Sequence, residues 1–230
     1  MTHKIAALRM QRNQRRVTAQ MEDGRTLTLA AILAAPLRVG QPLDDAQITR
    51  LEREDLLEDG FQRSLALIAR RPRSRAELET YLRRRKLDAA TISEVIERLA
   101  QRGFINDAEF ARAWVENRQS FRPRSRRVLQ AELRKRGVTE DDSQPALEGV
   151  REHDAALAAA RKRAQRLAGH FPGDDRQARF AFEKKIIAFL AMRGFEFDLA
   201  RDTARQVWQE AQAGDGRAEI PSEEESEDER

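Results

Sequence analysis

The five residues Arg71-Pro72-Arg73-Ser74-Arg75 recur as Arg122-Pro123-Arg124-Ser125-Arg126, and this repetition decides the fold. The apolar residues behind each copy also match when the chain is shifted by 51 positions. The matched pairs are Leu78 with Leu129, Leu82 with Leu133, Leu87 with Val138, Ile96 with Leu147 and Leu99 with Val150. Self-similarity at a fixed period is typical of tandem units that bury their apolar faces against one another. The pattern therefore indicates a repeat protein with a long binding surface, not an enzyme with one deep pocket.

A third and more diverged copy lies a further 57 residues along the chain. Its apolar positions are Ile186, Leu190, Phe195 and Val207. Gly137, which follows Leu-Arg-Lys-Arg, corresponds to Gly194, which follows Leu-Ala-Met-Arg. Three copies predict three units, each of which packs its apolar face on a neighbour.

Capping residues divide the first unit into helices near 61–70, 74–86 and 89–102. Ser74, followed three residues later by Glu77, has the pattern of a capping box, and Asp88 is placed to cap the next helix. That next helix carries an apolar stripe at helical spacing, formed by Ile92, Val95, Ile96 and Leu99. Asn106 is placed to cap the helix that opens the second unit.

Pro145 falls where the repeat predicts the interior of a helix in the second unit. Proline in a helix interior costs about 3 kcal/mol, because it removes a hydrogen bond and clashes with the preceding turn. We therefore expect this helix to start late, with Ser143 as its cap.

The first sixty residues have a different pattern. Apolar and polar residues alternate over 17–21 and again over 27–29, and Asp23-Gly24 lies between the two runs. This arrangement predicts a β-hairpin. A weaker strand pattern covers 5–10. A helix over 44–59 is predicted from inward positions at Ile48, Leu51 and Leu56.

The sequence thus predicts a mostly α fold: three tandem three-helix repeats in an elongated array, preceded by a small N-terminal segment that contains a β-hairpin. The expected boundaries are 1–60 for the N-terminal segment with its helix, 61–106, 107–150 and 151–213 for the three repeats, and 214–230 for a disordered acidic tail.

Composition excludes several classes of function. No apolar run is long enough to span a membrane, and the start of the chain lacks the apolar segment of a secretory signal. The chain has no cysteine, and its three histidines are far apart. Asp107 and Glu109, the nearest approach to a catalytic carboxylate pair, fit better in the first turn of a helix. We expect a soluble, cytoplasmic protein that is not an enzyme and has no catalytic residue, metal, cofactor or membrane partner.

The net charge of +4 is unevenly distributed. Residues 215–230 include eight acidic and two basic side chains, a balance of −6, so the other 214 residues carry +10. Residues 64–140 alone contain 19 Lys and Arg against 10 Asp and Glu. A basic body of this kind indicates a polyanion or an acidic protein surface as the partner.

The arginines of the repeated phrase are the first candidates for contact with such a partner. Proline biases the preceding residue toward extended backbone, so these side chains should project from the loop, and the guanidinium fork suits phosphates and carboxylates. A second group lies at the C-terminal ends of the following helices, where cations also complement the helix dipole. The candidates are Arg70, Arg71, Arg73, Arg75, Arg83, Arg84, Arg122, Arg124, Arg126, Arg127, Arg134 and Lys135. The alternative is that both groups are solvated charges that favour solubility.

Aromatic residues among the arginines could stack on bases. Their helical spacing with leucines instead predicts core positions for Tyr81, Phe104, Trp114 and Trp208. The role of Phe121, beside the second basic loop, stays open. A later basic cluster is expected to be a solvated helix face, and it comprises Arg161, Lys162, Arg163 and Arg166.

Two motifs resemble those of the RecX family. The first is Ser-x-x-Glu-Leu, followed by the apolar stripe and then by Gly-Phe-Ile-Asn-Asp-Ala-Glu-Phe-Ala at 103–111. The second is Leu-x-x-Glu-Leu-x-x-Arg-Gly-Val at 129–138. The match covers about 60–212, with a looser match at the hairpin. The resemblance implies three three-helix repeats that lie along the groove of the filament that the RecA recombinase forms on single-stranded DNA.

Such a protein would regulate homologous recombination, DNA repair and the SOS response, as a monomer that restrains growth, ATPase activity and strand exchange of the RecA filament. A stand-alone helical nucleic-acid-binding protein explains the charge equally well. The two hypotheses differ in whether binding requires RecA. A further hypothesis is that the acidic tail competes with nucleic acid for the basic repeats.

Overall fold

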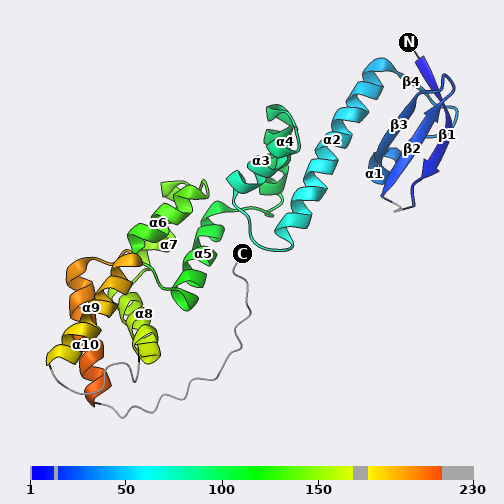
Figure 1. Cartoon of the computed structure of the whole chain (residues 1–230). Helices are drawn as coiled ribbons and strands as arrows, with labels where there is room; N and C mark the ends of the chain where they lie inside the picture. Colours follow the sequence, from blue (N-terminus) through cyan, green and yellow to red (C-terminus); the bar gives the residue numbers. More distant parts are fainter. Residues whose placement is uncertain (1, 13–14, 168–175, 214–230) are drawn as a thin grey trace. The chain divides into compact units, whose positions relative to one another are not determined.

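The computed structural model describes residues 2–12, 15–167 and 176–213. Those residues form ten helices and one four-stranded sheet (Figure 1). Tertiary contacts divide the chain into unit 1, of residues 1–111 and 133–143, and unit 2, of residues 112–132 and 144–230. The predicted acidic tail at 214–230 lies outside the described residues.

Unit 1 begins with an antiparallel sheet in the order β3-β2-β1-β4. Its strands are β1 (Thr2–Met10), β2 (Arg16–Met21), β3 (Thr26–Ala30) and β4 (Pro42–Asp44). The predicted hairpin is β2–β3, with Val17 opposite Leu29 and Ala19 opposite Leu27. Alternate residues of a strand share one face, so all four side chains are buried in one core. Strand β4 and helix α1 (Ala31–Ala34) were not predicted, because both are too short to show a periodic pattern of apolar residues.

Helix α2 (Asp45–Ile68) joins two segments that were predicted as separate helices. The expected break near residue 60 is wrong, because Gly60 is helical. A Cβ at Gly60 would lie 3.1 Å from side-chain atoms of both Leu87 and Val95. The glycine therefore permits close packing of α2 against Leu87 and Val95, and it does not form a turn.

The inward face of α2 also differs from the prediction. Leu56 is 52% exposed, whereas Leu57 is 2% exposed. The reason is that this helix serves two cores: Leu51 packs in the core of the sheet, and Leu57 packs with Phe61 in the core of the first repeat. A single apolar stripe that starts at Ile48 predicts one buried face for the whole helix, whereas the two halves of α2 bury different faces in different cores.

The first repeat consists of the second half of α2, α3 (Arg75–Arg84) and α4 (Ala89–Gln101). Asp88 caps α4 as predicted, because its carboxylate accepts the Thr91 N–H at 3.0 Å. Ser74 caps α3 by accepting the Glu77 N–H at 3.2 Å, but the Glu77 carboxylate binds arginines and does not complete a capping box. The predicted apolar stripe of α4 is entirely buried, at Ile92, Val95, Ile96 and Leu99.

The second repeat contains α5 (Asp107–Phe121), α6 (Arg126–Lys135) and α7 (Glu140–Glu148), and the boundary between the two units passes through these helices. The expected late start of α7 is wrong, because Pro145 lies inside the helix. Thr139 caps α7 by accepting the Asp142 N–H at 3.2 Å, and acidic residues in the first turn favour the helix N-terminus. Ser143 is buried instead, and its hydroxyl donates to the Glu140 carbonyl.

The third repeat contains α8 (Glu152–Leu167), α9 (Arg176–Met192) and α10 (Phe197–Ala213), all in unit 2. Helix α8 contributes short side chains to the core, namely Ala155, Ala156, Ala159 and Ala160. Trp208 of α10 is buried, and its ring lies 5.2 Å from that of Phe182. The prediction that Trp208 is a core residue is confirmed.

Residues matched by the repetition occupy corresponding core positions. Leu78, Leu129 and Ile186 on the second helix of each repeat have no exposed surface. The same holds one turn later for Leu82, Leu133 and Leu190. Residues that match in the sequence repeat therefore occupy the same place in the core of each repeat. The predicted arrangement of three-helix repeats after a small strand-containing segment is confirmed.

Candidate functional site

The repeated Arg-Pro-Arg-Ser-Arg phrase contacts the C-terminal end of the second helix of the following repeat. We call this contact between the serine of the phrase and the Arg-Gly pair that ends the helix the joint. In unit 1, Ser74 is fully buried, and its hydroxyl donates to the Arg136 carbonyl at 2.7 Å. Gly137 follows with a φ of 77°, and a Cβ there would overlap the Cβ of Ala76. The Arg136 guanidinium closes the joint by binding the Glu77 carboxylate.

The same joint recurs in unit 2. Ser125 is 1% exposed, its hydroxyl accepts the Val128 N–H at 3.3 Å, and its own N–H donates to the Arg193 carbonyl at 3.1 Å. Gly194 has a φ of 87°, and a Cβ there would overlap Val128 Cγ2. The Arg193 guanidinium donates to the Pro123 carbonyl at 2.9 Å. Close approach at a serine helix cap thus explains why serine and glycine recur together with the arginines.

Three of the predicted contact arginines are bound within their own unit. Arg71 and Arg73 both pair with Glu77, at 3.0 and 3.7 Å. Arg124 pairs with Glu132 at 2.7 Å. A carboxylate of the adjoining helix therefore holds each of these three side chains, and their role as partner contacts stays a prediction.

The other predicted residues are all exposed. Arg126 donates to the Val150 carbonyl at 3.2 Å. Eight more side chains are exposed and form no ion pair with another described residue: Arg70, Arg75, Arg83, Arg84, Arg122, Arg127, Arg134 and Lys135. These eight can meet a partner without breaking an ion pair within the described fold, and their role as contact residues stays a prediction.

Arg122 lines a pocket of about 760 Å³ in unit 2, between the loop after α5 and the helices α8 and α9. Six of its eleven described lining residues are cationic, and none is acidic. The cationic residues are Arg122, Arg124, Lys162, Arg163, Arg166 and Arg193. We call this feature the basic pocket. It is a concentration of positive charge of the kind that binds phosphates or carboxylates.

Two cations of the basic pocket are already engaged in the fold. Arg124 pairs with Glu132, and Arg193 donates to a carbonyl while its guanidinium lies 4.5 Å from the centre of the Phe189 ring. The remaining four, Arg122, Lys162, Arg163 and Arg166, form no ion pair with a described residue. Arg163 also has a buried Nε without a hydrogen-bond partner among the described residues.

The electrostatics of the pocket reflect this excess of positive charge. Burial lowers the pKa of Arg193, and the neighbouring charges of Arg124, Arg122 and Arg166 lower it further. Arginine stays protonated at physiological pH, so Arg193 keeps its charge, and the contribution of its three cationic neighbours to the lowered pKa reflects a positive potential. An anion in the pocket would relieve this repulsion.

The sequence analysis missed most of the basic pocket. It expected Lys162, Arg163 and Arg166 to be a solvated helix face, and it assigned no role to Arg193. The available signal was the spacing of Ala159, Lys162 or Arg163, and Arg166, which places them on one face of α8. Because the side chain of Ala159 is short, it leaves space beside the long side chains of Lys162, Arg163 and Arg166, and the pocket occupies that space.

The predictions for aromatic residues are confirmed only in part. Trp208 is buried, but Phe104 is 44% exposed, because it follows the end of α4 and lies outside the helical stripe. Tyr81 and Trp114 are half-buried. Phe121, whose role was open, lines the basic pocket and is 64% exposed.

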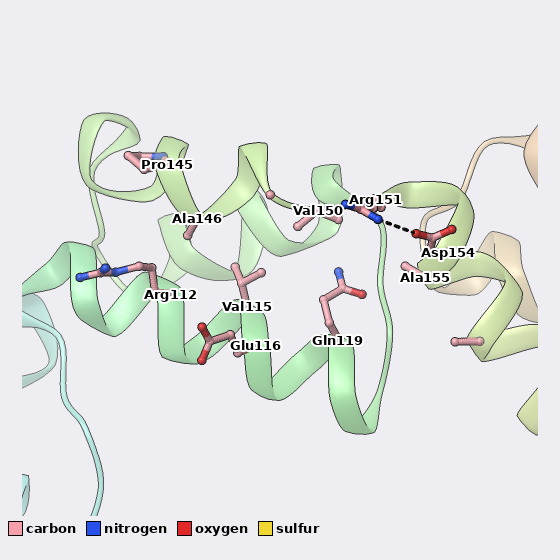
Figure 2. A pocket seen from close by; sticks show the side chains of 12 residues that line it. Arg112, Val115, Glu116, Gln119, Pro145, Ala146, Val150, Arg151, Asp154 and Ala155 are labelled. Carbon is pink, nitrogen blue, oxygen red and sulfur yellow. Dashed lines mark ion pairs between the residues drawn. The ribbon is translucent and has the colours of Figure 1, made fainter.

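A second pocket of unit 2, of about 570 Å³, has a mostly apolar lining (Figure 2). Val115 of α5 faces Ala146 of α7 across it, and Arg151 pairs with Asp154 at 3.9 Å at one end. Its described lining contains no serine, threonine, cysteine, lysine or histidine. Its acidic residues are Glu116 and Asp154, which come from α5 and α8.

Within residues 2–12, 15–167 and 176–213, no group of three or more His, Asp or Glu residues is arranged to hold a metal ion. Within the same ranges, no helix combines the length and apolar character needed to cross a membrane. The basic pocket is thus the site with the clearest ligand chemistry in the part of the chain that the structure describes.

Fold and site together define a helical repeat protein with a pocket suited to anions. Family models for the first and second three-helix domains of RecX match residues 61–99 and 106–147. The regulatory protein RecX of Thermobifida fusca is 36% identical over 172 residues, which cover 75% of this chain and 89% of that protein. The chain belongs to the RecX family.

Further comparisons agree with this assignment. The regulatory protein RecX of Bacillus pumilus is 30% identical over 199 residues, which cover 86% of this chain and 72% of that protein. A crystal structure of a regulatory protein RecX superposes with a TM-score of 0.65 at 19% identity, over 86% of this chain and 96% of that one. RecX from Lactobacillus salivarius gives a TM-score of 0.57 at 22% identity, over 68% of this chain and 99% of that one. At these identities the two structures support the fold alone.

Proposed function

We propose that this protein is a non-enzymatic, cytoplasmic regulator of RecA in recombination and DNA repair. It binds the filament of RecA on single-stranded DNA and inhibits filament assembly, ATP hydrolysis and strand exchange. Membership of a family whose members are named regulatory proteins supports a regulatory role. The observation that carries the proposal is the basic pocket. Its four cations without an ion-pair partner among the described residues fit the phosphates of the strand or acidic side chains of the filament.

The pocket can receive a single strand in a specific way. Arg122, Lys162 and Arg166 have exposed side chains that can neutralise successive phosphates. The exposed ring of Phe121 offers a stacking surface for a base, an interaction worth about 1–3 kcal/mol. Phe189 does not serve this purpose, because the guanidinium groups of Arg163 and Arg193 lie against its ring.

Salt dependence tests whether protein contacts with RecA contribute. Four phosphate contacts on a single strand give a slope of about −2.8 in log affinity against log salt, which is about a fiftyfold loss between ~50 and ~200 mM. We expect bare single-stranded DNA to follow this slope. Binding to RecA filaments should lose no more than about tenfold, because contacts with RecA take the place of some of those with phosphate and each phosphate contact that is lost reduces the slope by about 0.7. Both affinities can be measured by fluorescence anisotropy with labelled DNA and by co-sedimentation of filaments.

The alternative, a stand-alone nucleic-acid-binding protein, rests on the same pocket and makes a different prediction. In that case filaments and bare DNA would show equal affinity and equal salt slopes. Such a result, together with an unchanged rate of filament assembly, would overturn the proposed regulation of RecA and leave nucleic-acid binding in place.

A further inference from the structure

The basic pocket and the acidic segment at 214–230 are complementary parts of one chain. Residues 223–229 contain six acidic side chains in seven positions. The pocket presents four cations without an ion-pair partner among the described residues, and its described lining has no acidic residue. We propose that the acidic segment occupies the basic pocket when nucleic acid is absent and is displaced when a strand binds. This inference concerns regulation of the proposed site and rests on the proposed function for its biological meaning.

The pocket favours an anionic occupant. Like charges held close together in a partly buried site repel one another. The pKa of the Arg193 guanidinium is lowered first by burial and then by the neighbouring charges of Arg124, Arg122 and Arg166. Solvent and salt relieve the repulsion incompletely where side chains are partly buried, as those of Arg163 and Arg193 are. A carboxylate placed among these cations gains charge-assisted hydrogen bonds from guanidinium groups.

The acidic segment can reach the pocket. Helix α10 ends at Ala213, in the same unit as the pocket. Nine residues lie between Ala213 and Glu223, so ten Cα–Cα steps join them, and a chain of that length extends up to about 33–36 Å. Glu210, three residues before the end of α10, pairs with Arg161 at 2.7 Å, and Arg161 is followed in the chain by Lys162 of the pocket. The end of α10 therefore lies near the cations that α8 contributes to the pocket, within the span of the connecting residues.

Attachment to the same chain makes a weak contact effective. A segment held by a short connection acts at an effective concentration in the millimolar range. Individual exposed ion pairs are weak and are screened by salt. The contact should therefore hold at low salt, give way to a polyanion such as single-stranded DNA, and disappear at high salt.

The test uses the full-length chain with a neutral tail, in which Glu223, Glu224, Glu225, Glu227 and Glu229 become Gln and Asp228 becomes Asn. This variant keeps the length of the segment. We expect it to bind labelled single-stranded DNA on the order of fivefold more tightly than the unmodified chain at ~50 mM salt, and equally at ~300 mM. The same change on top of Arg122→Gln, Lys162→Gln and Arg166→Gln should have no effect, because the pocket has then lost its three exposed cations.

A second measurement separates this inference from the proposed function. A labelled peptide of residues 214–230 should bind a chain truncated after Ala213, and the three pocket substitutions should remove that binding. Peptide binding without any binding of DNA or RecA filaments would support the pocket contact and overturn the proposed function. DNA binding that is indifferent to the neutral tail, with no peptide binding, would overturn the inference and leave the proposed function intact. Equal tightening in the presence and absence of the pocket cations would also overturn it.

Discussion

The triple variant Arg122→Gln, Lys162→Gln, Arg166→Gln is expected to bind single-stranded DNA on the order of a hundredfold more weakly at ~50 mM salt. Each substitution removes an exposed cation of the basic pocket that has no ion-pair partner among the described residues. Each lost phosphate contact should reduce the salt slope by about 0.7, so the slope should fall by about 2.1 in total. Anisotropy titrations at four salt concentrations measure both quantities.

A matched control removes the same charge elsewhere in unit 2. Arg161→Gln, Arg201→Gln and Arg205→Gln also remove three positive charges, but each of these arginines pairs with a carboxylate. Exposed ion pairs contribute at most about 1 kcal/mol, so the control should fold normally. We expect its affinity for DNA to change less than threefold. If the two triple variants lost affinity equally, net charge would explain binding and the pocket would not be the site.

The variant Gly194→Ala is expected to destabilise unit 2 by about 2–5 kcal/mol. A φ of 87° costs a residue with a Cβ about 1–2 kcal/mol. The new methyl group would also overlap Val128 and Ser125, and overpacking of this kind costs about 1–3 kcal/mol. Urea unfolding followed by circular dichroism measures the loss, and the fluorescence of Trp208 in the same unit provides a second probe.

Gly103→Ala serves as the control for the effect of backbone conformation alone. Gly103 also has a positive φ, of 72°, but no atom lies within 4 Å of a Cβ built there. The substitution should cost only about 1–2 kcal/mol. Gly137→Ala, which would overlap Ala76 in the first joint, should resemble Gly194→Ala. Equal losses in the free energy of unfolding at Gly103 and Gly194 would show that Gly194 matters only for its positive φ and not for the close contact with Val128 and Ser125.

The sequence predicted the repeat cores well because periodicity reports burial directly. Leu78, Leu129 and Ile186 were matched by spacing alone, and all three are fully buried. The caps at Asp88 and Asn106 were also correct, since a cap involves only residues two or three positions away. Helix caps and the periodic burial of apolar residues can be predicted from a single sequence, because both depend on residues that are close together along the chain.

The role of the repeated phrase could not be derived in the same way. Its arginines looked like free loop charges, yet Arg73 binds Glu77 and Arg124 binds Glu132. The joint also depends on Ser74 meeting the Arg136 carbonyl, 62 residues away. Repetition showed that the phrase matters, but its physical cause is a tertiary contact between successive repeats.

The basic pocket was hidden for a related reason. Arg122 was predicted as a contact residue, but most of its neighbours in the pocket lie on α8 and α9, at least 37 residues further along. Lys162 and Arg166 looked like an ordinary solvated face because nothing in α8 indicates what lies opposite. The pocket exists only once the loop after α5 is placed beside these helices.

The most direct test of the central claim is ATP hydrolysis by RecA on single-stranded DNA, with this protein added well below the concentration of RecA. A regulator that binds filaments and blocks their growth should suppress hydrolysis at such ratios, and the Arg122→Gln, Lys162→Gln, Arg166→Gln variant should suppress it much less. An unchanged rate at every ratio, for a protein that still binds bare DNA, would contradict the proposed regulation of RecA.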